Sequence, residues 1–117
     1  MIGIDIIKID RIEKFVKKFG EKAFKRFLSE NEIRNNRQNF KRLAGYWAVK
    51  EAISKSLKVG IGKDFSFLDV EILKDERGAP IAKLSEQVIQ KFSIKDISIS
   101  ITHDGDYAIA VAVVELK

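Results

Sequence analysis

Leu43-Ala44-Gly45-Tyr46-Trp47-Ala48-Val49-Lys50-Glu51-Ala52-Ile53-Ser54-Lys55-Ser56-Leu57 is a stretch without proline that runs up to the glycine pair Gly60 and Gly62. At 3.6 residues per turn its large apolar side chains fill one wide arc, which is typical of a helix packed against a sheet. The arc holds Leu43, Tyr46, Trp47, Val49, Ile53 and Leu57. We therefore expect a long central helix that carries the rest of the fold.

Three charged residues in this helix call for an explanation. Glu51 and Lys55 stand one turn apart, which allows an exposed ion pair worth about 0.3–0.5 kcal/mol. The alternative is a binding site, because the positions beside them are small: Ala44, Ala48 and Ala52. Lys50 falls inside the apolar arc, where a lysine must extend to solvent or meet an anion.

The composition bounds the possible functions. The chain has 117 residues, no cysteine and a net charge of +5, which predicts one domain over residues 1–117 that is small enough to favour oligomerisation. No apolar run reaches the roughly 20 residues of a membrane span, and no signal peptide is recognisable, so we expect a cytoplasmic protein. The positive charge favours anionic partners: nucleic acid, phosphorylated small molecules or an acidic protein.

The N-terminal segment predicts a strand followed by an amphipathic helix. Residues 2–7 alternate with period two, and Asp5 interrupts one face, either as a turn former or as a placed ligand. Residues 9–19 have helical periodicity, and Asp10 and Glu13 are spaced like a capping box. The polar face of this helix is basic and holds Arg11, Lys14 and Lys18.

The remainder of the chain mixes short helices with antiparallel hairpins, so the predicted class is α+β, a small antiparallel sheet packed with a long central helix. We expect one helix at 21–28, a second that begins at Ser29 with Glu32 as the partner of Ser29 in a capping box, and a third that Ser85 caps. Strands are expected at 65–73, 81–84, 97–102 and 107–115. In the last strand, small side chains alternate with large ones, which allows a helix to pack closely on them: Ala108, Ala110 and Ala112.

Several familiar sites are excluded by the residues themselves. Without cysteine there is no thiol nucleophile, and the single histidine, His103, lacks partners for a zinc site. The segment Gly60-Ile61-Gly62-Lys63 is no phosphate-binding loop of the Walker type, which requires glycine at Leu57 and a hydroxyl residue at Asp64. No strand carries the glycine-aromatic pattern of an RNA-recognition motif. What remains suits a pyrophosphate and Mg²⁺, which uses one or two carboxylates and completes its shell with water and phosphate: Asp5, Lys50, Glu51, Lys55 and His103.

Motifs in five regions extend this picture: Ile2-Gly3-Ile4-Asp5-Ile6, Phe27-Leu28-Ser29-Glu30-Asn31-Glu32, the central block from Leu43 to Lys55, Gly60-Ile61-Gly62 with Phe65 and Phe67, and the segment from Ser98 to His103 with Tyr107 to Ala110. In this order they resemble the holo-[acyl-carrier-protein] synthases, the short bacterial type of 4′-phosphopantetheinyl transferase, over nearly the whole chain. One position departs from that family, which usually has arginine where this chain has Tyr46. Any phosphate contact of that arginine does not carry over.

The resemblance implies transfer of 4′-phosphopantetheine from coenzyme A to a serine of apo-acyl carrier protein, as in fatty acid biosynthesis, with release of adenosine 3′,5′-bisphosphate. Asp5 and Glu51 would hold Mg²⁺ and Lys55 would steady the leaving phosphate. Glu51, directly or through a bound water, would accept the serine proton. The coenzyme A contacts that it implies are Lys50, Thr102 and His103.

The resemblance also implies a homotrimer with active sites at the subunit interfaces. The acidic carrier would dock on Arg11, Lys14 and Lys18, and neither nucleic acid nor membrane would be a partner. The alternative function is a small basic nucleic-acid-binding domain without catalysis. A transferase would increase the mass of an acyl carrier protein in the presence of coenzyme A. A nucleic-acid-binding domain would leave that mass unchanged and bind DNA or RNA in a salt-sensitive manner.

Overall fold

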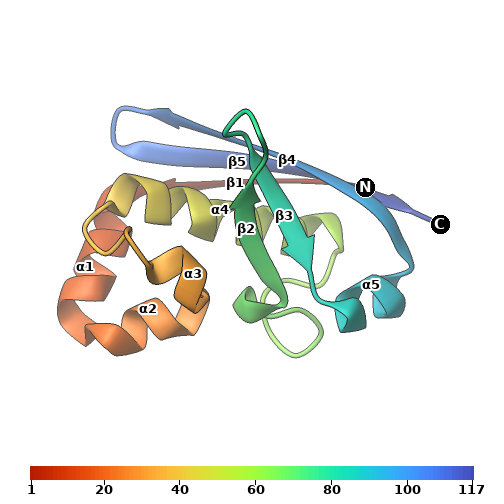
Figure 1. Cartoon of the computed structure of the whole chain (residues 1–117), viewed down its shortest axis with the longest axis horizontal. Helices are drawn as coiled ribbons and strands as arrows, with labels where there is room; N and C mark the ends of the chain where they lie inside the picture. Colours follow the sequence, from red (N-terminus) through yellow and green to blue (C-terminus); the bar gives the residue numbers. More distant parts are fainter.

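The computed structural model describes residues 1–117 and confirms an α+β fold (Figure 1). An antiparallel three-stranded sheet has the order β1-β5-β4, and a separate hairpin pairs β2 with β3. The strands are β1 (Ile2–Lys8), β2 (Val70–Lys74), β3 (Pro80–Leu84), β4 (Ile94–Asp104) and β5 (Tyr107–Leu116). The helices are α1 (Ile9–Phe19), α2 (Glu21–Phe27), α3 (Glu30–Ile33), α4 (Phe40–Ser56), the 3₁₀ turn η1 (Phe67–Asp69) and α5 (Glu86–Phe92). None of them is long and apolar enough to cross a membrane.

Helix α4 lies along one face of the three-stranded sheet, and all other helices lie on the same side (Figure 1). The approach is close because small residues meet there. On the helix these are Ala44, Ala48 and Ala52, and on β5 they are Ala108, Ala110 and Ala112, all of them buried. The predicted close packing of a helix on β5 is therefore confirmed. The alanines of α4 are buried in this packing and leave no space beside them for a ligand.

Gly3 brings β1 equally close to α4. A Cβ atom at position 3 would lie 2.0 Å from the carbonyl oxygen of Ala52 and 2.7 Å from the backbone nitrogen of Ser56, so no other residue fits without moving the strand. Because side chains alternate along a strand, Asp5 faces α4 as Gly3 does. The glycine thus sets the spacing at which Asp5 meets the helix.

Two local predictions are wrong. Helix α1 begins after Lys8 without a side-chain cap, and Asp10 sits inside its first turn, where it pairs with Lys14 at 3.0 Å instead of forming a capping box. The strand expected at 65–73 begins only at Val70. The preceding turn is held by Asp69, whose carboxylate accepts a hydrogen bond from the backbone nitrogen of Ser66 at 2.8 Å. The box formed by Ser29 and Glu32 is confirmed.

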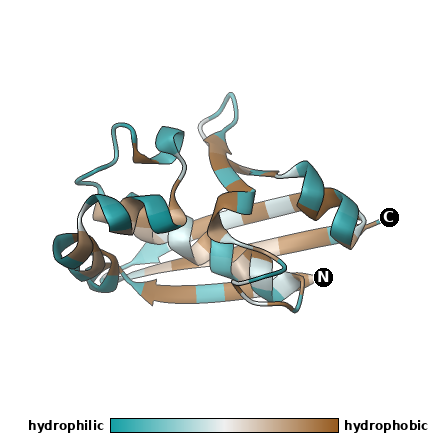
Figure 2. Ribbon diagram, turned by 90° about the horizontal axis from the view of Figure 1, so that it is seen from below, coloured by the Kyte–Doolittle hydropathy of each residue, from teal (hydrophilic) through white to brown (hydrophobic).

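The second face of the three-stranded sheet has no covering element. The outward side chains of β1 are Ile2, Ile4 and Ile6, which are 70%, 60% and 56% exposed. In the ladder they stand beside Val113, Val111 and Ile109 of the central strand. Figure 2 shows these strands coloured largely as hydrophobic. An apolar sheet face of this kind commonly marks a contact with another chain.

Candidate functional site

Asp5 and Lys55 form the centre of the candidate site. Lys55 Nζ donates hydrogen bonds to Asp5 Oδ1 at 2.9 Å and to the carbonyl oxygen of Ile4 at 3.2 Å. This bond raises the pKa of Lys55, which keeps the ammonium charged. The exposed i,i+4 ion pair between Glu51 and Lys55, which the sequence offered as the alternative to a binding site, does not form. The lysine instead binds the strand aspartate that the sequence singled out.

Glu51 lies beside this pair. Burial raises the pKa of Glu51, the negative charge of Asp5 raises it further, and the charges of Lys55 and Arg11 oppose the rise. The two carboxylates are therefore close enough to repel each other. Neither has a third acidic or histidine partner in a cluster of metal-binding size. Two carboxylates that repel each other next to open solvent suit a divalent cation that takes its other ligands from water and phosphate.

Lys50 is a correction to the predicted coenzyme A contacts. Its side chain is fully buried, and its Nζ donates to Glu32 Oε1 and to the carbonyl oxygen of Phe27, both at 2.7 Å. Glu32 also accepts from the backbone nitrogens of Ser29 and Ile72, so the pair joins α3, α4 and β2. Burial lowers the pKa of Lys50 and the Glu32 charge opposes this effect. Lys50 meets an anion inside the core and has no surface left for a ligand.

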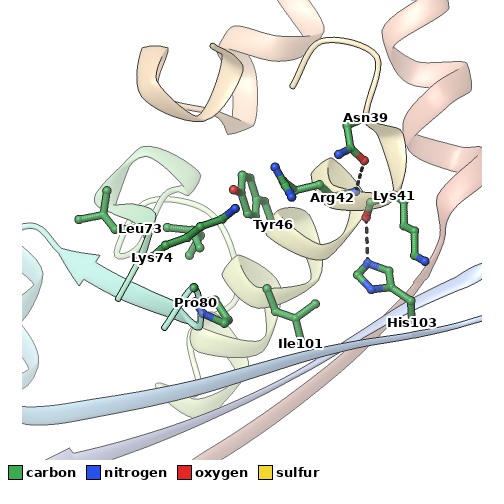
Figure 3. Close-up of a pocket in the computed structure, with 11 residues that line it drawn as sticks. Asn39, Lys41, Arg42, Tyr46, Leu73, Lys74, Pro80, Ile101 and His103 are labelled. Atoms are coloured by element: carbon green, nitrogen blue, oxygen red, sulfur yellow. Dashed lines mark hydrogen bonds between the residues drawn. The ribbon is translucent and has the colours of Figure 1, made fainter. Parts of the chain in front are cut away.

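Thr102 and His103 point to opposite faces of the sheet because they are neighbours on β4. Thr102 pairs with Ile109 on the uncovered face, whereas His103 pairs with Ala108 on the side of α4. The Nε2 atom of His103 lies 3.0 Å from the carbonyl oxygen of Lys41 (Figure 3). Gly45 makes room for the ring, since a Cβ there would lie 3.4 Å from Nε2.

His103 borders a cavity of about 320 Å³ between α4, β4 and the β2–β3 hairpin (Figure 3). Its lining combines cations and polar groups with an apolar part and contains no carboxylate. The polar members are Asn39, Lys41, Arg42, Tyr46, Lys74 and His103, and the others are Ile72, Leu73, Gly78, Pro80 and Ile101. Lys41, Arg42 and Lys74 were missed in the sequence. Arg42 could have been suspected from its place one turn before Tyr46 in α4, but Lys74 reaches the cavity only through the hairpin.

The carboxylates and this cavity do not meet within one chain. Asp5 lies on the edge strand β1 and His103 on the opposite edge strand β4, with β5 between them. Asp5, Glu51 and Lys55 are all absent from the cavity lining. The site is thus divided into two half-sites, which we call the carboxylate half-site (Asp5, Glu51 and Lys55) and the cationic pocket, the cavity that His103 borders. Lys50 and Thr102 belong to neither.

A second groove lies over α1 and α2, near the carboxylate half-site. The three predicted docking residues, Arg11, Lys14 and Lys18, all line it, and its floor is apolar: Ile7, Ile12, Phe15, Phe19 and Trp47. Arg26 of α2 adds a cation that the sequence did not single out, because only the packing of α2 on α1 brings it there. The charge of Arg11 acts on Glu51, which links the groove to the carboxylate half-site.

Comparison with known proteins places this geometry in context. Residues 1–112 match the model of the 4′-phosphopantetheinyl transferase superfamily. The chain is 52% identical to the holo-[acyl-carrier-protein] synthase of Nautilia profundicola over the full length of both. It is also 52% identical to that of Sulfurimonas denitrificans, over 98% of this chain and 94% of the relative.

Solved structures agree with the sequence comparison. The crystal structure of Helicobacter pylori holo-[acyl-carrier-protein] synthase in complex with coenzyme A matches with a TM-score of 0.94 and 50% identity, over 98% of this chain and 100% of that one. The enzyme from Neisseria meningitidis matches with a TM-score of 0.89 and 30% identity, over 97% and 96% of the two chains. The likeness therefore covers the whole fold, including both half-sites.

Proposed function

This chain belongs to the holo-[acyl-carrier-protein] synthases of the 4′-phosphopantetheinyl transferase superfamily, and we propose that its carboxylate half-site carries out their reaction. The enzyme transfers 4′-phosphopantetheine from coenzyme A to a serine of apo-acyl carrier protein. The observation that carries the assignment of the site is the contact of Asp5 with Lys55 beside Glu51, which joins the two motifs that carry the chemistry.

Mg²⁺ fits this half-site, and Asp5 and Glu51 are the residues that would hold it. Burial raises the pKa of Glu51, and the charge of Asp5 raises it further. A divalent cation would relieve this repulsion between the two carboxylates. Two carboxylates are as many as Mg²⁺ commonly takes from a protein when phosphate oxygens complete its shell. The ion would supply charge neutralisation at the pyrophosphate.

The chain's own side chains account for the remaining chemistry. The serine oxygen forms a bond to the phosphorus atom next to the pantetheine arm, and the bond from that phosphorus to the bridging oxygen breaks. Adenosine 3′,5′-bisphosphate leaves with the bridging oxygen. Glu51 accepts the serine proton, directly or through a bound water, because a general base must lie within hydrogen-bond reach of the proton it accepts. Lys55 stabilises the negative charge that develops on the leaving phosphate.

The two half-sites support a shared active site in a homotrimer. A carboxylate half-site of one subunit would face the cationic pocket of its neighbour, where His103 contacts the nucleotide. Three such head-to-tail contacts close a ring. The exposed apolar face of the sheet, with Ile2, Ile4 and Ile6, supplies surface that such an assembly would bury. Thr102 lies on that face, so its contact with coenzyme A would be made across the interface.

The basic groove supports docking of the carrier. Acyl carrier proteins are acidic, and a rim of Arg11, Lys14, Lys18 and Arg26 around aromatic side chains offers both charge and apolar area. The charge of Arg11 acts on Glu51, so a carrier in the groove would dock next to the carboxylate half-site. We place the reaction in the cytoplasm, where both substrates are found.

The function is tested by incubating the protein with coenzyme A, MgCl₂ and an apo-acyl carrier protein and weighing the carrier by mass spectrometry. We expect the mass of one phosphopantetheine group to be added, and chelation of the metal to prevent it. A carrier variant with alanine at the acceptor serine is the control. An unchanged carrier mass would contradict the function, and salt-sensitive binding of DNA or RNA would then favour the alternative.

A further inference from the structure

Lys55 holds oxygen atoms of the kind that a divalent cation takes as ligands. Its Nζ donates to Asp5 Oδ1 at 2.9 Å and to the carbonyl oxygen of Ile4 at 3.2 Å. Carboxylate and carbonyl oxygens are also what Mg²⁺ and Mn²⁺ prefer. The ammonium of Lys55 and a divalent cation at the carboxylate half-site therefore have an acceptor in common.

The two partners of this ion pair differ in freedom. The side chain of Asp5 is 14% exposed and that of Lys55 is 53% exposed. Asp5 is fixed by the close approach of β1 to α4, whereas Lys55 reaches it from the last turn of α4 on a flexible stem. If the pair separates, the lysine is the residue that moves.

Lys55 is the one cation in direct contact with the two carboxylates. No other ion pair of the chain involves Asp5 or Glu51. A divalent cation bound to Asp5 would stand next to the ammonium, and repulsion between two cations is strong at a partly buried site. The lysine and the divalent cation thus oppose each other at Asp5.

We propose that Lys55 competes with the divalent cation for Asp5 and turns to the phosphate of coenzyme A when that cation binds. This inference rests on the proposed function, in which Lys55 stabilises the leaving phosphate. An ammonium has three donors, and Asp5 and Ile4 hold two of them. Release from Asp5 makes the lysine available to the phosphate only when the cation is in place, which couples the two binding steps.

The test measures the binding of Mn²⁺, which takes the same kind of ligand as Mg²⁺ and is counted by its electron paramagnetic resonance signal. The full-length protein is titrated with MnCl₂ in the absence of coenzyme A. Lys55→Met removes the ammonium and keeps an unbranched side chain, so Mn²⁺ should bind roughly five- to tenfold more tightly than to the wild type. Lys55→Arg keeps a charged donor at this position and should show no such gain.

A second measurement distinguishes competition from a merely structural role of Lys55. At saturating MnCl₂, Lys55→Met should bind coenzyme A several-fold more weakly than the wild type in titration calorimetry, because the phosphate lacks its ammonium partner. One substitution thus shifts the two affinities in opposite directions. Weaker binding of both Mn²⁺ and coenzyme A would show a damaged site and contradict the proposal.

Arg11→Gln is the matched control, because the charge of Arg11 acts on Glu51 while Lys55 alone forms an ion pair at the carboxylates. It should raise the affinity for Mn²⁺ roughly twofold at most, since a charge at a distance is screened. Equal affinities of the wild type and Lys55→Met, or an equal gain in Arg11→Gln, would overturn the competition and leave the proposed function intact. Asp5→Asn should lose Mn²⁺ binding. Wild-type affinity in Asp5→Asn would overturn the metal site itself, and with it both proposals.

Discussion

Lys55 Nζ lies 2.9 Å from Asp5 Oδ1, although the two residues are 50 positions apart in the chain. The contact forms because Gly3 lets β1 lie directly on α4, so that the aspartate two residues later faces the lysine. It joins the N-terminal motif to the central helix at the point where Glu51 also lies. The chemistry that we assign to the protein depends on this junction between a strand and a helix.

Glu51→Gln should separate activity from stability. The substitution keeps the volume and removes the charge, so transfer should fall by about two orders of magnitude or more, as expected when a base and ligand is lost. Steady-state assays with saturating Mg²⁺ measure the effect. A variant that retains near-normal activity at limiting Mg²⁺ would remove Glu51 from the mechanism.

The same variant has a predicted pH signature in metal-free buffer. Because burial and Asp5 raise the pKa of Glu51 above 4.5, the folded chain binds that proton more tightly than the unfolded chain. The free energy of unfolding of the wild type therefore falls as the pH rises from 4.5 through the raised value. Glu51→Gln lacks this loss and should be the more stable protein at neutral pH, with the difference vanishing in acid. Thermal melting curves of both proteins from acid to neutral pH measure the difference. A Tm of Glu51→Gln that is lower than or equal to that of the wild type at neutral pH would contradict the raised pKa of Glu51.

Gly3→Ala should destabilise the fold by about 1–3 kcal/mol or more and reduce activity as well, since the added Cβ would collide with the backbone of α4. Gly62→Ala is the matched control, because a Cβ there meets nothing within 4 Å. Urea unfolding of the two variants measures the difference. Equal stability of both variants would mean that β1 and α4 do not pack as closely as described.

Lys50→Met should cost about 3–5 kcal/mol, because it leaves Glu32 charged and without its ammonium partner in the core. Adding Glu32→Gln removes the stranded charge and should recover a large part of the loss. A double-mutant cycle from urea unfolding gives the coupling between the two residues. Additive losses would show that the pair does not act as a unit.

Charge reversal in the groove tests the docking of the carrier. The KM for the carrier should rise several-fold, and the KM for coenzyme A should stay unchanged, in the triple variant Lys14→Glu, Lys18→Glu and Arg26→Glu. Arg11 is kept because its charge also acts on Glu51. The control carries Lys58→Glu, Lys63→Glu and Lys83→Glu, the same change in net charge outside the groove. A rise in the KM for coenzyme A instead would assign these cations to the nucleotide.

The local elements were predictable wherever the pattern itself carries the physical cause. The period of 3.6 revealed α4, and the Ser29 and Glu32 box marked the start of α3. The strand before Val70 was mistaken because alternation continues into a turn that Asp69 holds by hydrogen bonds, which periodicity does not detect.

The partners of the charged residues were harder to predict, since they come from distant parts of the chain. The helical period offered Lys50 either solvent or an anion and could not identify Glu32 as that anion. It suggested Glu51 as the partner of Lys55, which in fact binds Asp5. The separation of His103 from Asp5 follows from the strand order, which no local pattern contains.

The most direct test of a shared active site is complementation between two inactive variants within the proposed homotrimer. The variant Glu51→Gln has a defective carboxylate half-site and an intact cationic pocket. The combined variant Arg42→Gln and His103→Ala has a defective cationic pocket and an intact carboxylate half-site. Differently tagged copies of the two are co-expressed, and transfer to the carrier is measured. Random mixing in a three-membered ring makes one interface in four intact, so about a quarter of the wild-type rate should return. A rate no higher than the mean of the two parents would contradict the account, because each site would then lie within a single chain.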